Sequence, residues 1–236
     1  MSDPPLPRAV AFDLDGLMFN TEDLYDEAGA IILQRRGKEF TAYLKRKVMG
    51  LPSDLALQVM IDFHNLDATA EQLWCESDVI LDEMLGPRLA PLEGLWELLN
   101  ALEAASIPKA IATGSSRSFA RKVLGHFDLE PRFQFLLTSE DVRQGKPHPE
   151  IYLKAAERFG LKPVQLLVLE DSENGCRAAV AAGAYTVAVP SPHSSDHDFD
   201  GVHLVADSLS DRRIYEAMGL RREETASMPP TGAGPR

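Results

Sequence analysis

The chain has 236 residues, of which 44% are hydrophobic and 25% are charged, and its formal net charge is −12. This length and composition are typical of a soluble globular protein with one large domain or two smaller ones, and the negative charge disfavours nucleic acids and anionic membranes as partners. No apolar run approaches the ~18 residues of a membrane helix, and residues 1–8 are polar and proline-rich, unlike a signal peptide. Two distant cysteines, Cys75 and Cys176, lack metal-ligand spacing and favour a reduced, cytoplasmic protein. We therefore expect a cytoplasmic protein that binds neither nucleic acid nor membrane, and we take a monomer as the default.

The first apolar run, residues 9–12, has the length and residue types of a buried strand. Helical patterns follow at residues 21–36, 43–48, 53–63 and 70–85, with Asn20 or Thr21 as a cap for the first and Ser53 for the third. No convincing strand occurs between positions 19 and 89. Because a crossover between parallel strands needs only one helix, this surplus predicts an inserted helical subdomain over residues 19–88, hinged at 17–20 and 86–91.

From residue 92 the pattern alternates between helix and strand. We expect helices at 94–105, 119–126, 150–159, 174–182 and 211–218, and strands at 110–112, 135–137, 166–169, 186–189 and 204–205. This alternation predicts an α/β fold with a doubly wound parallel sheet, formed by residues 1–18 and 89–220. Residues 221–236 are rich in Pro, Gly, Ser, Thr and charge, and are expected to be disordered.

The polar residues of most interest come directly after expected strands: Asp13, Asp15, Thr113, Gly114, Glu170 and Asp171. In an open parallel sheet the carboxyl ends of the strands line one crevice, in which ligands bind. The topology therefore predicts that these residues meet, although they are far apart in the chain. Lys146, in a proline-rich loop that leads into a helix, is expected to join them.

The charges in this crevice point to a cation. Asp13, Asp15 and Asp171 cannot all be ionised close together without one, and hard carboxylate oxygens select Mg²⁺. Thr113 and Gly114, expected at a helix N-terminus, suit a phosphate group, and the lysine in the proline-rich loop adds a compact positive charge. This combination predicts phosphoryl transfer, in which positioning and charge neutralisation do most of the catalysis.

The expected mechanism has two displacements. Asp13 attacks phosphorus and forms an aspartyl-phosphate, and Asp15 first protonates the departing alcohol oxygen and then removes a proton from the attacking water. The ion is expected on Asp13, Asp171 and the backbone carbonyl of Asp15. The helical insertion is expected to close over the crevice and exclude water.

Each motif alone also has an ordinary structural interpretation. An isolated Asp-x-Asp is typical of a solvated turn, Thr-Gly-Ser-Ser of a helix cap, and a single lysine of the surface. The combined order of the motifs after successive strands is what favours a site. A further tract, with His193, His197 and His203 among aspartates, could hold a metal, but its spacing matches no common site and favours a polar loop.

Four short motifs resemble those of the haloacid dehalogenase-like superfamily of phosphatases and mutases. They are Phe-Asp-Leu-Asp-Gly at 12–16, Ile-Ala-Thr-Gly-Ser at 111–115, Gly-Lys-Pro at 145–147 and Leu-Glu-Asp-Ser at 169–172, within a match that spans residues 9–189. The resemblance implies a Rossmann-like core, dependence on Mg²⁺, Asp13 as nucleophile and Asp15 as acid–base group. It also implies phosphate contacts by Thr113, Gly114 and Lys146, and metal ligation by Asp13, Asp15 and Asp171, assisted by Glu170.

The insertion after the first motif is similar to the small α-helical cap of the β-phosphoglucomutase-like branch. Residues 15–25 and 48–50 most resemble pseudouridine-5′-phosphatases and sugar-phosphate phosphatases of that branch. The mutases carry a cap arginine for a second phosphate shortly after the glycine that matches Gly50, and a cap histidine where this chain has Tyr25. This chain has neither, which favours a phosphatase, although four cap cations keep the mutase open as an alternative: Arg35, Arg36, Lys45 and Arg46.

Three functions therefore compete. The first is a Mg²⁺-dependent phosphatase for a small phosphorylated metabolite, either a sugar phosphate or a nucleoside monophosphate. The second is a phosphomutase of the same fold. The third is a signalling receiver domain, which is also phosphorylated on an aspartate at a strand end, but receivers are shorter and lack the insertion, and Asp15 suits turnover rather than a persistent phosphate. Tyr25, Met49 and Trp74 are candidates for substrate contact.

Overall fold

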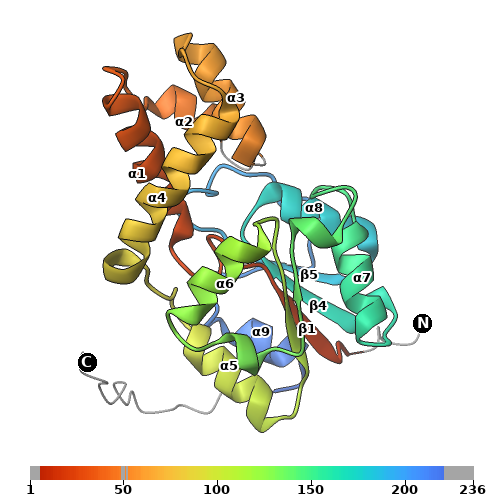
Figure 1. The fold of residues 1–236 in the computed structure, drawn as a ribbon. Helices are drawn as coiled ribbons and strands as arrows, with labels where there is room; N and C mark the ends of the chain where they lie inside the picture. The colour runs from red at the N-terminus through yellow and green to blue at the C-terminus, as the bar shows by residue number, and fades with distance from the viewer. Residues whose placement is uncertain (1–5, 49–50, 52, 221–236) are drawn as a thin grey trace, which may run out of the picture.

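A computed structural model describes residues 6–48, 51 and 53–220 of the chain. Met49, and the segment 221–236 that we expect to be disordered, lie outside the described residues. The described chain folds around a six-stranded sheet with helices on both faces and a separate group of helices at one end (Figure 1). The strands are β1 (Ala9–Phe12), β2 (Lys109–Ala112), β3 (Leu136–Leu137), β4 (Leu166–Glu170), β5 (Tyr185–Ala188) and β6 (Leu204–Val205).

The sheet has the strand order β3-β2-β1-β4-β5-β6, and every pair of neighbours is parallel. β1 lies in the middle, and the chain moves outward from it first through β2 and β3 and then through β4 to β6. The order therefore reverses at β1, which places a crevice at its carboxyl end. Phe12, the last residue of β1, is level with Ile111 of β2 and Leu169 of β4.

The side chains of the strands alternate between two hydrophobic layers, as the strand period requires. Val10 and Phe12 belong to the layer covered by α5 (Leu95–Ala104), α6 (Arg117–Gly125) and α9 (Arg212–Ala217). Ala9 and Ala11 belong to the layer covered by α7 (Glu150–Arg158) and α8 (Glu173–Ala182). Both faces of the sheet are thus buried, which explains why its strands read as continuous apolar runs in the sequence.

The insertion between β1 and β2 forms the group of helices at the end of the sheet (Figure 1). It contains α1 (Thr21–Gln34), α2 (Ala42–Val48), α3 (Ser53–His64) and α4 (Ala70–Arg88), with α1 and α3 packed on α4 and α2 packed on α3. Buried side chains of the insertion, such as Leu24, Ile32 and Leu73, join the same hydrophobic cluster as Phe12 of the sheet. The insertion therefore packs directly onto the core.

The fold class is confirmed: an α/β, Rossmann-like parallel sheet with an inserted helical cap. One helix end is wrong, because α4 continues to Arg88 instead of ending near Leu85. Leu85 and Leu89 are both buried, and the N–H of Leu89 still donates to the carbonyl of Leu85, so packing outweighs the backbone bond that Pro87 lacks. Three short 3-10 helices were not expected: Glu130–Arg132, Ser139–Asp141 and Pro163–Gln165.

The two connections between the insertion and the core are tied together by Asn20. Asn20 stands at the N-cap position of α1, but its side chain makes no capping hydrogen bond. Its amide donates to the carbonyl of Arg88 at 3.3 Å and its Oδ1 accepts the N–H of Ala90 at 2.7 Å. A residue expected to cap a helix thus links the entry and exit of the insertion.

Candidate active site

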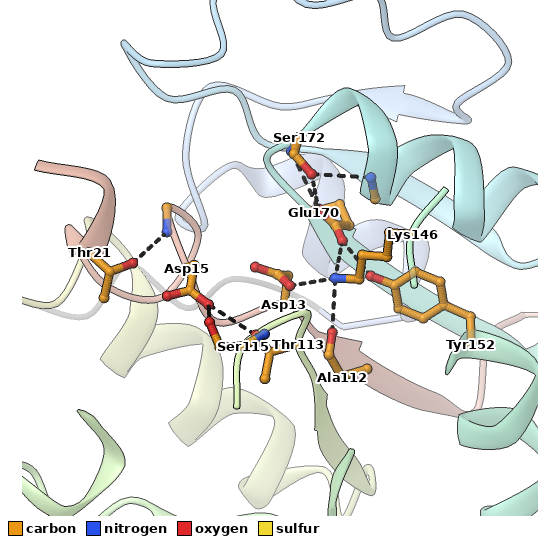
Figure 2. A network of polar contacts seen from close by, with 12 residues as sticks. Asp13, Asp15, Thr21, Ala112, Thr113, Ser115, Lys146, Tyr152, Glu170 and Ser172 are labelled. Atoms are coloured by element: carbon orange, nitrogen blue, oxygen red, sulfur yellow. Dashed lines mark hydrogen bonds and ion pairs between the residues drawn. The ribbon is translucent and has the colours of Figure 1, made fainter. Parts of the chain in front are cut away.

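The predicted site residues meet at the carboxyl ends of β1, β2 and β4 (Figure 2). Asp13 directly follows β1, and its N–H donates to the carbonyl of Leu169 at 3.0 Å. Thr113 directly follows β2. Glu170 is the last residue of β4, and Asp171 is the next residue in the chain. The parallel register therefore brings together groups that are far apart in the chain.

Lys146 lies at the centre of the site. Its Nζ donates to Asp13 Oδ1 at 2.5 Å, to Glu170 Oε1 at 2.6 Å and to the carbonyl of Ala112 at 3.0 Å (Figure 2). Only 11% of its side chain is exposed. Burial alone would lower the pKa of Lys146, but the carboxylates of Asp13 and Glu170 outweigh it and raise that pKa well above its usual value. The lysine is therefore a permanent positive charge beside Asp13.

Glu170 is a fully buried anchor for this lysine. Besides the lysine, its Oε1 accepts the hydroxyl of Tyr152 at 2.5 Å, and its Oε2 accepts the hydroxyl of Ser172 at 3.1 Å. Gly175 of α8 leaves room for this carboxylate, because a Cβ there would lie 1.8 Å from Glu170 Oε1. With both oxygens occupied, Glu170 is placed to orient the lysine.

Three buried carboxylates form a group that fits a metal ion. Asp13, Glu170 and Asp171 each offer an oxygen, and these oxygens lie within 4.8 Å of one another. Burial raises the pKa of Asp13 well above its usual value despite the nearby lysine, and burial together with Glu170 and Asp13 does the same for Asp171. The group thus carries more negative charge than one lysine balances, and its oxygen ligands suit a hard divalent cation.

Asp15 occupies a different environment, although it is only two residues from Asp13. Its carboxylate lies outside the group of three, and its Oδ2 accepts hydroxyls from Thr113 at 3.0 Å and Ser115 at 2.6 Å (Figure 2). Its Oδ1 is buried and has no hydrogen-bond partner in the described structure. Gly16 makes this turn possible, because it has a φ of +71° and a Cβ there would lie 2.4 Å from Asp171 Oδ2.

The turn after β2 differs from the expected helix start. Thr113 and Gly114 do not open a helix; α6 begins at Arg117, with Ser116 as its cap. Thr113 Oγ1 accepts the N–H of Ser115 at 3.0 Å and donates to Asp15, so its hydroxyl organises the turn. The polar residues after β2 prefer this side-chain turn to a longer helix. The predicted phosphate contacts of Thr113 and Gly114 stay predictions.

The insertion contributes two side chains near the site, Glu22 and Tyr25 of α1. The hydroxyl of Tyr25 lies 3.5 Å from Ser115 Oγ, and its ring contacts that of Phe119 with a centroid distance of 5.3 Å. Burial, followed by the charge of Asp15, raises the pKa of Glu22 to about 7. Of the other substrate candidates, Trp74 is 49% exposed on α4, and Met49 lies outside the described residues.

Sequence reasoning missed Tyr152 and Glu22 as members of the site, and it included Ser115 only as part of the motif at 111–115. Tyr152 reads as one more core residue of an amphipathic helix, and Ser115 as part of a helix cap. Glu22 reads as a first-turn acid of α1. Only the position of Glu22, seven residues after Asp15 on the first helix of the insertion, could have indicated it.

The histidine tract forms structural contacts to separate segments. His193 contacts Asp23 of α1 at 2.6 Å and Lys45 of α2 at 3.0 Å, which joins this loop to the insertion. His197 Nδ1 accepts the N–H of Glu173, and His203 Nδ1 accepts the N–H of Thr186. Among the described residues, these histidines do not gather into a metal site.

Comparison with known proteins shows the family to which the chain belongs. The family model of haloacid dehalogenase-like hydrolases matches residues 10–189. The chain belongs to this family. It is 34% identical over 206 residues to a probable pseudouridine-5′-phosphatase of Drosophila melanogaster, covering 85% of this chain and 89% of that protein. It is 33% identical over 176 residues to a phosphorylated carbohydrates phosphatase of Thermotoga maritima, covering 75% and 82%.

Solved structures of the family share the fold. A putative β-phosphoglucomutase from Thermotoga maritima superposes with a TM-score of 0.72 at 29% identity, covering 90% of this chain and 97% of that one. The resemblance to this family and its β-phosphoglucomutase-like branch is therefore confirmed. In the described part of the chain, no helix combines the length and the apolar character that crossing a membrane would require.

We predict that Gly175→Ala disables the site without unfolding the protein. The added methyl group would displace Glu170, and with it the lysine that Glu170 orients. Phosphatase activity should fall by about two orders of magnitude, in line with the loss of a group that positions charge. Gly125→Ala is the matched control, since a Cβ at that glycine would meet nothing within 4 Å. Equal activity of the two variants would contradict the role of Glu170.

We predict that Glu22→Gln stabilises the metal-free protein at high pH. The pKa of Glu22 is raised from 4.5 to about 7 in the folded protein, so the unfolded chain loses this proton at a lower pH than the folded protein does. The free energy of unfolding therefore falls as the pH rises from 4.5 to 7. The variant should therefore melt a few degrees above the wild type at pH 8 with EDTA present, and at the same temperature at pH 4. Glu83→Gln, at an exposed position on α4, is the control. A difference that is the same at both pH values would contradict the shifted pKa.

Proposed function

We propose that the chain is a Mg²⁺-dependent phosphatase that hydrolyses a small phosphomonoester, a sugar phosphate or a nucleoside monophosphate, through an aspartyl-phosphate on Asp13. The observation that carries the proposal is the separation of two neighbouring aspartates into two environments. Asp13 lies beside Lys146 in the charged cluster, and Asp15 is held outside it by two hydroxyls. Two carboxylates in different environments suit two different roles.

In this mechanism Asp13 is the nucleophile. Its Oδ1 contacts the lysine, which neutralises charge on the attacking carboxylate and on the phosphoryl group. Asp15 protonates the departing alcohol through Oδ1, the oxygen without another partner among the described residues, and then takes a proton from the water that hydrolyses the phosphoenzyme. Thr113, Gly114 and Lys146 are the proposed phosphate contacts.

Mg²⁺ would be held by Asp13, Asp171 and the backbone carbonyl of Asp15. The excess of buried carboxylates over cations in the described site supports this assignment. The ion would supply charge neutralisation for the phosphoryl oxygens. Because Glu170 already accepts hydrogen bonds on both oxygens, we assign it the support of the lysine before any part in binding the ion.

The relatives support the coarser part of the proposal, a phosphoric monoester hydrolase, because both are named as phosphatases of small phosphorylated compounds. We further propose that residues 19–88 act as a cap that closes the crevice. Glu22 and Tyr25 reach the site from this insertion, which supports a role for it in binding the leaving group. A monomeric, cytoplasmic enzyme remains our prediction.

A phosphomutase is the second candidate, because a solved structure that is 29% identical is a putative β-phosphoglucomutase. Three of the four cap cations weigh against it, and only Arg46 has no ion pair in the described structure. Arg35 and Arg36 both bind Glu76, and Lys45 binds Asp26. None of these three is therefore free for a second phosphate. Interconversion of sugar-phosphate isomers that requires a bisphosphate would favour the mutase over hydrolysis.

We predict that Asp13→Asn abolishes the release of inorganic phosphate from a panel of sugar phosphates and nucleoside monophosphates. The amide cannot act as the nucleophile, so activity should fall by at least about three orders of magnitude. Asp67→Asn, an exposed position in the insertion, should keep wild-type activity. Phosphate release that survives Asp13→Asn would rule out the aspartyl-phosphate.

We predict that removal of divalent cations with EDTA abolishes activity and that added Mg²⁺ restores it. The metal-free protein should also be less stable than the Mg²⁺-bound protein, because an ion that binds only to the folded state stabilises that state. Added Mg²⁺ should therefore raise the melting temperature of the wild type but not that of Asp171→Asn. Full activity in EDTA would contradict the metal assignment.

A further inference from the structure

A row of hydroxyl groups connects Asp15 to the helical insertion. Asp15 Oδ2 accepts the hydroxyl of Ser115 at 2.6 Å, and Ser115 Oγ lies 3.5 Å from the hydroxyl of Tyr25 on α1. Thr113 donates to the same Oδ2 at 3.0 Å (Figure 2). The acid–base group is therefore held from a turn of the core and approached from the cap.

The direction of these contacts follows from the number of protons. A serine hydroxyl has one proton, and Ser115 gives it to Asp15. Its oxygen can then only accept from Tyr25. Burial, followed by the charge of Asp15, raises the pKa of Tyr25 well above its usual value, so the phenol keeps the proton that it would donate. Each hydroxyl thus points toward Asp15.

These contacts determine which carboxylate oxygen of Asp15 is available for proton transfer. Oδ2 already accepts two hydrogen bonds, whereas Oδ1 is buried without a partner in the described structure. Two donors on one oxygen fix the plane of the carboxylate and leave Oδ1 to carry the transferred proton. The shorter of the two bonds, at 2.6 Å, comes from Ser115.

The contact of Tyr25 with Ser115 depends on how the insertion lies on the core. Its ring packs against Phe119 of α6, while its backbone belongs to α1. The distance of 3.5 Å to Ser115 is at the long limit of a hydrogen bond, so a small displacement of α1 decides whether it forms.

We propose that Ser115 is a positioning residue for Asp15 and that Tyr25 acts through Ser115, so that the acid–base carboxylate is fully set only when the helical insertion is seated on the core. This inference rests on the proposed function, because it concerns the protonation of the leaving group by Asp15. The competing interpretation is that Ser115 and Tyr25 contact the substrate directly.

The first test compares two leaving groups. An alkyl phosphate needs protonation of its leaving oxygen, whereas 4-nitrophenyl phosphate has a leaving group that departs without it. Ser115→Ala should lower kcat/KM for the alkyl ester about 100-fold, since a positioned general acid contributes a factor of about 100 or more. For the aryl ester the same variant should lower kcat/KM less than about threefold, because this ester does not need the acid. The ratio kcat/KM reports the steps up to leaving-group departure, and therefore the acid role alone.

Two further variants keep this test decisive. Ser115→Thr retains the hydroxyl and should keep the wild-type ratio of alkyl to aryl activity. Ser116→Ala is the matched control, because Ser116 caps α6 and does not contact Asp15. It should affect both esters equally. A loss in Ser115→Ala that is the same for both esters would overturn the inference.

The second test asks whether Tyr25 acts through the serine. Tyr25→Phe should lower kcat/KM for the alkyl ester several-fold in the wild-type background and have no further effect in Ser115→Ala. Tyr43→Phe, at an exposed tyrosine of α2, is the control. If the two losses of kcat/KM multiply in the double variant, Tyr25 contacts the substrate independently of Ser115. This result would overturn the inference that Tyr25 acts through Ser115.

The two levels of the proposal fail in different ways. A wild-type protein that hydrolysed neither ester in Mg²⁺ would overturn the proposed function and the positioning role together. A wild type active on both esters, with a Ser115→Ala variant that keeps the wild-type ratio between them, would overturn the positioning role alone.

Discussion

The structure of the site depends on one buried lysine among several buried carboxylates. Lys146 contacts Asp13 and Glu170, and Asp171 adds a third acid at the same end of the sheet. Buried charges are tolerated only when they are paired and hydrogen-bonded. Glu170 meets this condition through Tyr152 and Ser172, but the raised pKa values of Asp13 and Asp171 show that the remaining charge is not balanced. A site that needs another cation to be fully ionised is well suited to bind one together with a phosphate.

The turn after β1 separates two neighbouring aspartates. Asp13 continues the register of the strand and donates its N–H to Leu169, whereas Asp15 leaves the sheet and forms an isolated bridge with Phe19. Gly16 permits this change of direction because its backbone is left-handed and any side chain there would meet Asp171. One residue of strand geometry and one glycine thus place the two carboxylates in environments that differ in charge, and we propose that this difference separates the nucleophile from the acid–base group.

The part of the site that follows strand ends could be predicted from the sequence, because topology alone brings such positions together. Asp13, Thr113 and Asp171 belong to this class, and the structure brings them to one crevice. Tyr152 could not be predicted, because its role depends on which helix face meets which strand end, and a hydrophobic period does not contain that information. Ser115 follows a strand end, but the direction of its side chain toward Asp15 depends on the turn at 113–116. The start of α6 and the end of α4 were misplaced for a related reason: side-chain bonds in the turn at 113–116 and burial of Leu85 and Leu89 override the local propensity.

In the proposed mechanism, the insertion faces the leaving-group side of the crevice and brings charged groups to it. The face of α1 that reaches the site carries Glu22 beside Asp15, and Asp26 of the same helix is paired with Lys45. Arg35 and Arg36 are paired with Glu76 elsewhere in the insertion. Of the four cap cations, only Arg46 has no ion pair in the described structure, and it is exposed on α2. In the proposed mechanism, Glu22 would therefore disfavour a second negative charge on the leaving group, which is an electrostatic argument for a monophosphate over a bisphosphate.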